Sequence, residues 1–219
     1  MSSGGISPRT VRIGGVAWVV GPLQFLVLTT LEALLLLSQG YSYSFLTNTI
    51  SNLGDPSLFP FPYYWMLNAS AIALGALVLV GLPAFRAYRP SGAAGTVASV
   101  LLLLTAIGAI GVGVFNEHLD YSIHISMATL AFVSEGLVLL VVGIAAFWDP
   151  GWKGWAIPSL VGAGVTAVAL VFFAMNTQWL LGHGGWERLV VLPSVIWVIL
   201  VGVKLLRTRP SSLPAARPG

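Results

Sequence analysis

Long apolar segments separated by short polar ones dominate the chain. Each segment has about 20 or more mostly apolar residues, enough for an α-helix to cross about 30 Å of hydrocarbon. We therefore predict an all-α fold, a polytopic transmembrane bundle of six helices, with spans at about 13–37, 63–85, 93–115, 122–147, 155–181 and 186–206. We expect a cytoplasmic N-terminal tail at 1–10, a transmembrane domain at 11–207 and a flexible cytoplasmic tail at 208–219.

Composition narrows the class further. Of the 219 residues, 57% are apolar and only 8% are charged, whereas soluble globular proteins average about 25% charged residues. This excludes a soluble enzyme. The chain has no Cys, which rules out disulfides and thiolate metal sites. The ten Lys and Arg stand at the ends of spans and are not clustered on one element, so we expect membrane lipids and partner membrane subunits as the binding partners, and no nucleic acid.

Basic residues also predict an orientation. With a cytoplasmic N-terminus, nine of the ten Lys and Arg lie on the cytoplasmic side and only Arg188 lies outside. Membrane proteins show this bias in their cytoplasmic loops. We therefore predict a multi-pass protein of the cell membrane with both termini in the cytoplasm.

The uncommon polar residues collect near the helix ends predicted to face outward. Because three separate junctions contribute them, we expect one ligand-binding polar site there, formed by Asn48, Ser51, Asn52, Asp55, Asn116, Glu117, His124, Glu187 and Arg188. Arg188, as the only outward basic residue, could contact an anionic headgroup. A structural ion pair with Asp55, Glu117 or Asp120 is the alternative.

Two ionisable residues lie along the fourth span. His124 and Glu135 are eleven residues apart, which at about 100° per residue leaves them about 20° from eclipsed. Ala128 and Ala131 lie between them on the same stripe, so we expect this face to point inward. The candidates for catalysis are His124, Glu117 and Glu135. Glu32 in the first span is either a ligand-binding acid or an acceptor of hydrogen bonds from the loop backbone.

The three histidines are the candidates for metal binding. His118, His124 and His183 all fall on the outward side, with carboxylates nearby. No His pair with the spacing of a single-helix zinc site is present. We therefore assign no metal, and the residues identify no cofactor.

Three stretches resemble a known family. They are Tyr41–Gly54 with its Asn-Thr-Ile-Ser-Asn-Leu-Gly run, Gly113–Glu117 followed by His124, and Gly185–Arg188 leading into a span with Trp197. Together they resemble domain of unknown function 998, a family of six-span prokaryotic membrane proteins. Ser44 or Phe45 stands where that family commonly has Pro. The resemblance implies a six-span fold and a shared outward site, and it brings no known activity.

Three classes of function fit these observations. The first is binding or processing of a lipid or small amphiphile at the outer leaflet, which the outward polar residues favour. The second is a small-solute or proton-coupled transporter that uses Glu32, His124 and Glu135. The third is an accessory subunit of a larger membrane complex.

Overall fold

The computed structural model describes residues 6–60 and 62–208, and its long elements are all helices. Six of them are long and apolar enough to cross a membrane. They are α1 (Pro8–Ser38), α2 (Trp65–Tyr88), α3 (Gly92–Val114), α4 (Tyr121–Ala145), α5 (Ala156–Ala174) and α6 (Gly182–Arg207), with two short 3₁₀ helices, η1 (Ser51–Gly54) and η2 (Lys153–Trp155). The described ranges contain no strand. The predicted all-α bundle of six helices is confirmed.

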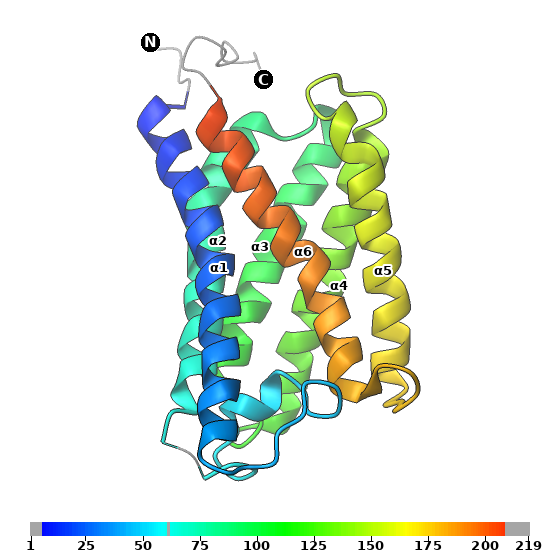
Figure 1. The fold of residues 1–219 in the computed structure, drawn as a ribbon. Coiled ribbons are helices and arrows are strands. Elements are labelled where there is room, and N and C mark those ends of the chain that lie inside the picture. Colours follow the sequence, from blue (N-terminus) through cyan, green and yellow to red (C-terminus); the bar gives the residue numbers. More distant parts are fainter. Residues whose placement is uncertain (1–5, 61, 209–219) are drawn as a thin grey trace.

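The helices form a closed ring in chain order. Each one packs against the next, and α6 also packs against α1. Figure 1 shows α6 crossing the front of the bundle obliquely, with its first turns near α5 and its last turns near α1. Further contacts join α6 to α4 and α2. A helix placed in this way can present side chains to the interior from one end of the bundle to the other.

The link between the last two helices differs from the prediction. Helix α5 ends at Ala174 and α6 begins at Gly182, whereas the sequence suggested spans at 155–181 and 186–206. Asn176 and Leu180 have φ of 50° and 63°. This left-handed conformation does not continue an α-helix. At the chain ends, α1 begins at Pro8, inside the predicted tail 1–10, while residues 1–5 and 209–219 lie outside the described residues.

Small residues let the helix backbones approach one another. A Cβ on Gly75 of α2 would lie 2.5 Å from the carbonyl oxygen of Ala106 on α3. Similarly, a Cβ on Gly108 of α3 would lie 2.7 Å from the carbonyl oxygen of Met127 on α4. Lipid provides no hydrophobic force that drives helices together, so close backbone packing is a main source of their association.

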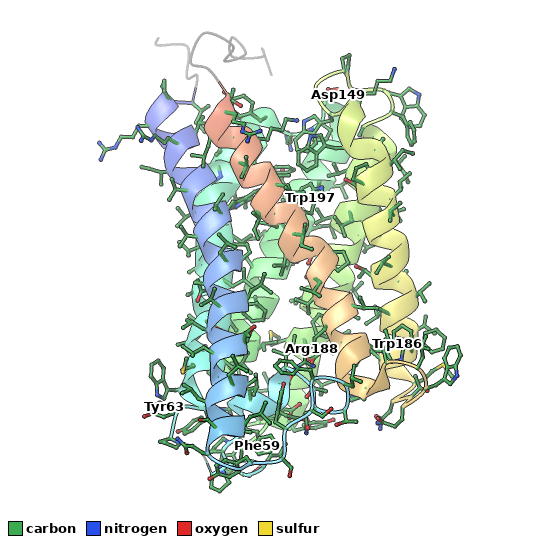
Figure 2. The ribbon with its side chains drawn as sticks, viewed as in Figure 1. Phe59, Tyr63, Asp149, Trp186, Arg188 and Trp197 are labelled. Atoms are coloured by element: carbon green, nitrogen blue, oxygen red, sulfur yellow. The ribbon has the colours of Figure 1, made fainter. Side chains whose placement is uncertain are left out.

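The two ends of the bundle are held differently. We call the end formed by residues 39–60, 62–64, 115–120 and 175–181 the loop end, which is the end predicted to face outward. At the opposite end, Trp18, Phe85, Trp152 and Trp197 pack ring against ring. There the Lys204 ammonium lies 3.7 Å from the centroid of the Trp152 ring. Figure 2 shows Asp149 at this opposite end and Arg188 and Phe59 at the loop end, where most of the candidate residues lie.

Candidate functional site

A folded segment of the long loop covers the loop end of the bundle. We call residues 41–54 the cap; Figure 1 shows that it runs from the end of α1 towards the start of α6. Its turns are closed by short polar side chains. Asn48 Oδ1 accepts a hydrogen bond from Ser44 N (3.0 Å), and Asn52 Oδ1 accepts one from Thr49 N (3.1 Å). Asn, Ser and Thr favour turns because they bond to nearby backbone in this way.

Arg188 on α6 fastens the cap. Its Nη1 lies 2.8 Å from each of three carbonyl oxygens, those of Phe45, Asn48 and Gly184. Its Nη2 donates to the hydroxyl of Tyr43. Burial raises the pKa of Tyr43 to about 12, so this hydroxyl stays neutral and keeps the proton that it donates to the carbonyl oxygen of Thr49. The guanidinium therefore bonds to backbone carbonyls of the cap and of α6 and to the Tyr43 hydroxyl.

This use of Arg188 differs from the ion pair that was the alternative expectation for it. Its hydrogen bonds from Nη1 and Nη2 go to the cap and to its own helix, and a contact with an anionic headgroup stays a prediction. Within residues 6–60 and 62–208, it forms no salt bridge with Asp55, Glu117 or Asp120. The reason is that the folded cap presents carbonyl oxygens at closer range than any of these carboxylates.

Glu187, the residue before Arg188 on α6, also bonds to the cap. Its Oε2 accepts from the backbone N–H of Ile50, and its Oε1 accepts from Ser51 Oγ at 3.1 Å. Only 2% of Glu187 is exposed. The backbone of Gly185 adds a bond from its N–H to the carbonyl oxygen of Leu46 (3.0 Å). The first turns of α6 and the cap therefore form one packed unit.

Glu117, Asn52 and His124 form the second part of the site. Asn52 Nδ2 donates to Glu117 Oε2 at 3.1 Å. His124 Nδ1 lies 2.8 Å from the carbonyl oxygen of Phe115, and because a carbonyl only accepts, Nδ1 bears the proton. In the neutral ring Nε2 is then an acceptor. It is buried without a hydrogen-bond partner, 4.0 Å from Glu117 Oε1. A group with two donor hydrogens can bond to both atoms.

Several predicted site residues lie elsewhere or serve local turns. Asp55 accepts from Ser57 N (2.7 Å) and Ser57 Oγ (2.6 Å). Asn116 Oδ1 accepts from Leu119 N. His118 is exposed, and His183 stacks on Phe173. Within the described ranges, no group of three or more His, Asp or Glu residues could hold a metal ion. The residues that come together are Asn48, Ser51, Asn52, Glu117, His124, Glu187 and Arg188.

Glu32 has a structural partner. Its Oε2 accepts from the backbone N–H of Leu67 at 2.7 Å, in the first turn of α2. The first N–H groups of a helix have no partner within the helix, and a carboxyl group there is favourable. Glu32 is fully buried and does not line the apolar cavities below the cap. This hydrogen bond matches the backbone-acceptor alternative, although the donor is in the helix and not in the loop.

Below the cap lies an apolar cavity in the middle of the bundle. It has a volume of about 90 Å³ and is lined by α1, α2, α3, α4 and α6. A second cavity of about 50 Å³ reaches from Ser51 and Glu187 towards it. The two share five lining residues, Phe25, Ala71, Val112, Phe132 and Val191. An apolar column thus extends from the cap into the middle of the bundle.

The predicted stripe of α4 borders this column. His124, Ala128, Ala131 and Glu135 are all buried. Ala128 lines the smaller cavity, and Ala131 and Glu135 line the larger one. Ser194 of α6 donates to Glu135 Oε2 at 2.6 Å. Ser194 is absent from the predicted site, although it follows Glu187 by seven residues, a spacing that puts both on one helix face.

Most of the chain matches a known protein family. A family model described as "Protein of unknown function (DUF998)" matches residues 19–204. The chain belongs to this family. The resemblance seen in the sequence is therefore confirmed over most of the chain, and the cap, Glu117, His124, Glu187 and Arg188 all lie within the matched part of this DUF998 protein. No curated protein and no solved structure matches it.

The titration of Glu117 gives a test of this geometry. Burial and, to a smaller extent, the charge of Asp55 raise the pKa of Glu117, while His124 and Asn52 oppose the rise. The folded protein thus keeps this proton to a higher pH than the unfolded chain, so the stability contributed by Glu117 is greatest in acid and falls as pH rises. We expect Glu117→Gln to have nearly the wild-type Tm in acid and to become the more stable protein towards neutral pH. Tm measured in detergent from about pH 4 to about pH 8 checks this; parallel profiles would contradict it.

Proposed function

We propose that this DUF998 protein binds an amphiphile from the outer leaflet, with the polar end of the ligand under the cap and its apolar part in the central cavity. The observation behind the proposal is the apolar column that extends from Ser51 and Glu187 to Glu135, between five helices. Ligand sites in membrane bundles and elsewhere commonly combine an apolar cavity with a few polar groups that fix orientation. The bias of basic residues supports the outward orientation.

The free groups at the site favour a ligand that donates hydrogen bonds. His124 Nε2 and Glu117 Oε1 face one another, and neither has a hydrogen bond to the other at 4.0 Å. The cation of the site, Arg188, is engaged with the cap. An anionic headgroup would meet carboxylates and find little free positive charge. A hydroxyl group can instead donate to the unpartnered Nε2 of His124, and an ammonium group can donate to this Nε2 and to Glu117 Oε1 together.

Blocking the column tests the proposal. We expect Ala71→Leu to prevent entry of an alkyl chain, because Ala71 lines both cavities and is 3% exposed. The probe is decanol with a photoreactive diazirine near its methyl end. Wild-type protein should be labelled at cavity-lining residues such as Phe132, with competition by unlabelled decanol. Labelling there should fall about tenfold in Ala71→Leu, since an added side chain in a filled space costs about 1–3 kcal/mol.

The matched control is Ala69→Leu. Ala69 lies on the exposed side of the same helix, two residues away, so its replacement adds equal bulk outside the cavity. Labelling of Phe132 should be unchanged in this variant. The proposal is wrong if Ala71→Leu is labelled as strongly as wild type, or if the label is found only on residues of the outer, lipid-facing helix surfaces.

A further inference from the structure

Glu135 has an incomplete hydrogen-bond set in the central cavity. Its Oε2 accepts from Ser194 Oγ at 2.6 Å, while Oε1 is buried with no hydrogen-bond partner. The side chain is 8% exposed and lines the cavity together with apolar residues such as Phe132 and Val195. Leaving a buried oxygen without a partner is unfavourable. A group that enters the cavity can supply the missing bond.

Water is a poor candidate for this partner. A buried water is held by about three hydrogen bonds, with a usual range of two to four. Besides Glu135, the side chains with polar atoms that line the cavity are Thr105, Ser194 and Trp197, and the indole N–H of Trp197 donates to Ser159 Oγ at 3.0 Å. The Thr105 hydroxyl donates to Leu101 O (3.0 Å), and the Ser194 hydroxyl lies within bonding distance of both Glu135 Oε2 and Val191 O. A water beside Glu135 Oε1 would therefore find few further donors or acceptors.

We propose that the central cavity binds the hydroxyl group of an otherwise aliphatic alcohol, with Glu135 Oε1 as its hydrogen-bond partner. A hydroxyl can donate to a carboxylate and can accept from a carboxylic acid. An ammonium group only donates, so it suits only the carboxylate form of Glu135. A ketone only accepts, so it suits only the carboxylic acid form. The apolar lining accommodates the carbon skeleton on either side of that hydroxyl.

This inference rests on the proposed function and adds a second polar contact to it. Ser194 follows Glu187 by seven residues on α6, which is about 10 Å along the helix axis. One ligand can therefore have its polar end near Glu187 and Glu117 and a second hydroxyl near Glu135. The ligand class is an amphiphile with two hydroxyl groups separated by a short aliphatic segment.

The experiment compares photoreactive probes that share one hydroxyl head and one chain length. They end in a hydroxyl, a ketone or a methyl group at the far end, and binding to the purified protein is measured by labelling of the cavity. Wild type should prefer the hydroxyl-ended probe over the methyl-ended probe by about tenfold, as one buried hydrogen bond predicts, and should bind the ketone-ended probe no more tightly than the hydroxyl-ended one. Glu135→Leu should remove this preference and still bind the methyl-ended probe. Glu135→Gln should retain much of it, since an amide both donates and accepts.

The outcomes separate the two proposals. If the methyl-ended probe binds, is blocked by Ala71→Leu, and competes equally with the hydroxyl-ended one, the amphiphile site stands and the role of Glu135 is wrong. A preference for the ketone-ended probe would also overturn the hydroxyl assignment. If Ala71→Leu affects no probe, the proposed function itself fails. Glu135→Gln can also overturn the assignment. If this variant loses the preference for the hydroxyl-ended probe as completely as Glu135→Leu does, the side chain at residue 135 does not act by hydrogen bonding.

Discussion

Arg188→Ala is expected to release the cap and to destabilise the protein strongly. Three carbonyl oxygens, each 2.8 Å from Nη1, would lose a charged donor, and the Tyr43 hydroxyl would lose the donor Nη2. Hydrogen bonds to charged groups contribute about 1.5–3 kcal/mol each and are not additive, so we expect a loss of about 2–4 kcal/mol. Tm in detergent should fall by roughly 5–10 °C, and proteolysis within residues 41–54 should become rapid.

Two variants separate this effect from a general loss of stability. Arg188→Lys keeps the charge but cannot reproduce the planar fork that reaches the cap carbonyls and Tyr43 together, so it should recover only part of the loss. Arg12→Ala removes an exposed arginine at the opposite end of the bundle and should leave Tm and cap proteolysis unchanged. A cap that resists protease in Arg188→Ala as well as in wild type would show that Arg188 does not fasten it.

Gly184→Ala should displace the cap by a steric route. A Cβ at residue 184 would lie 1.9 Å from the carbonyl oxygen of Asn48, a distance that requires backbone movement. Overpacking of this kind typically costs about 1–3 kcal/mol. We expect a lower Tm and faster hydrogen exchange of amides in residues 44–54, which mass spectrometry of digested peptides can measure.

The control for this substitution is Gly164→Ala on α5. No atom lies within 4 Å of a Cβ built at Gly164, and the residue is helical and exposed. Alanine is the better helix former by about 1 kcal/mol, so the control should be neutral or slightly stabilising. If Gly184→Ala leaves exchange in the cap at the wild-type rate, the close contact between α6 and Asn48 does not control the position of the cap.

The helical fold could be predicted from the sequence because hydrophobicity and length alone define membrane spans. A span needs about 20 apolar residues, and six such segments with short links leave one class of architecture. The error at the end of α5 has a local cause. Residues 175–181 include apolar side chains such as Trp179 and Leu180 that hydropathy cannot distinguish from helix, and their turns depend on left-handed φ at Asn176 and Leu180.

The candidate site was predictable in its residue types and not in its bonds. Clustering of polar side chains at the junctions predicted to face outward indicated Glu117, His124, Glu187 and the Asn-rich segment. The role of Arg188 was not predictable, because its partners are backbone carbonyls whose position depends on the folded cap. The glycine-rich pattern around Gly184 indicates a turn, whereas this residue is helical and makes room for Asn48. Such contacts join segments more than 130 residues apart, which local patterns do not report.

The bond from Leu67 N–H to Glu32 has a consequence for how the chain enters the membrane. A carboxyl group in a lone span is costly in hydrocarbon. Before α2 is inserted, Glu32 lacks the hydrogen bond from Leu67 N–H. The start of α2 has the matching problem, since its first N–H groups lack acceptors. Each helix thus supplies what the other lacks. The α1–α2 hairpin is therefore the smallest part of this protein in which Leu67 N–H and Glu32 Oε2 are both paired within the bilayer. This pairing favours insertion of the two helices as one unit during synthesis.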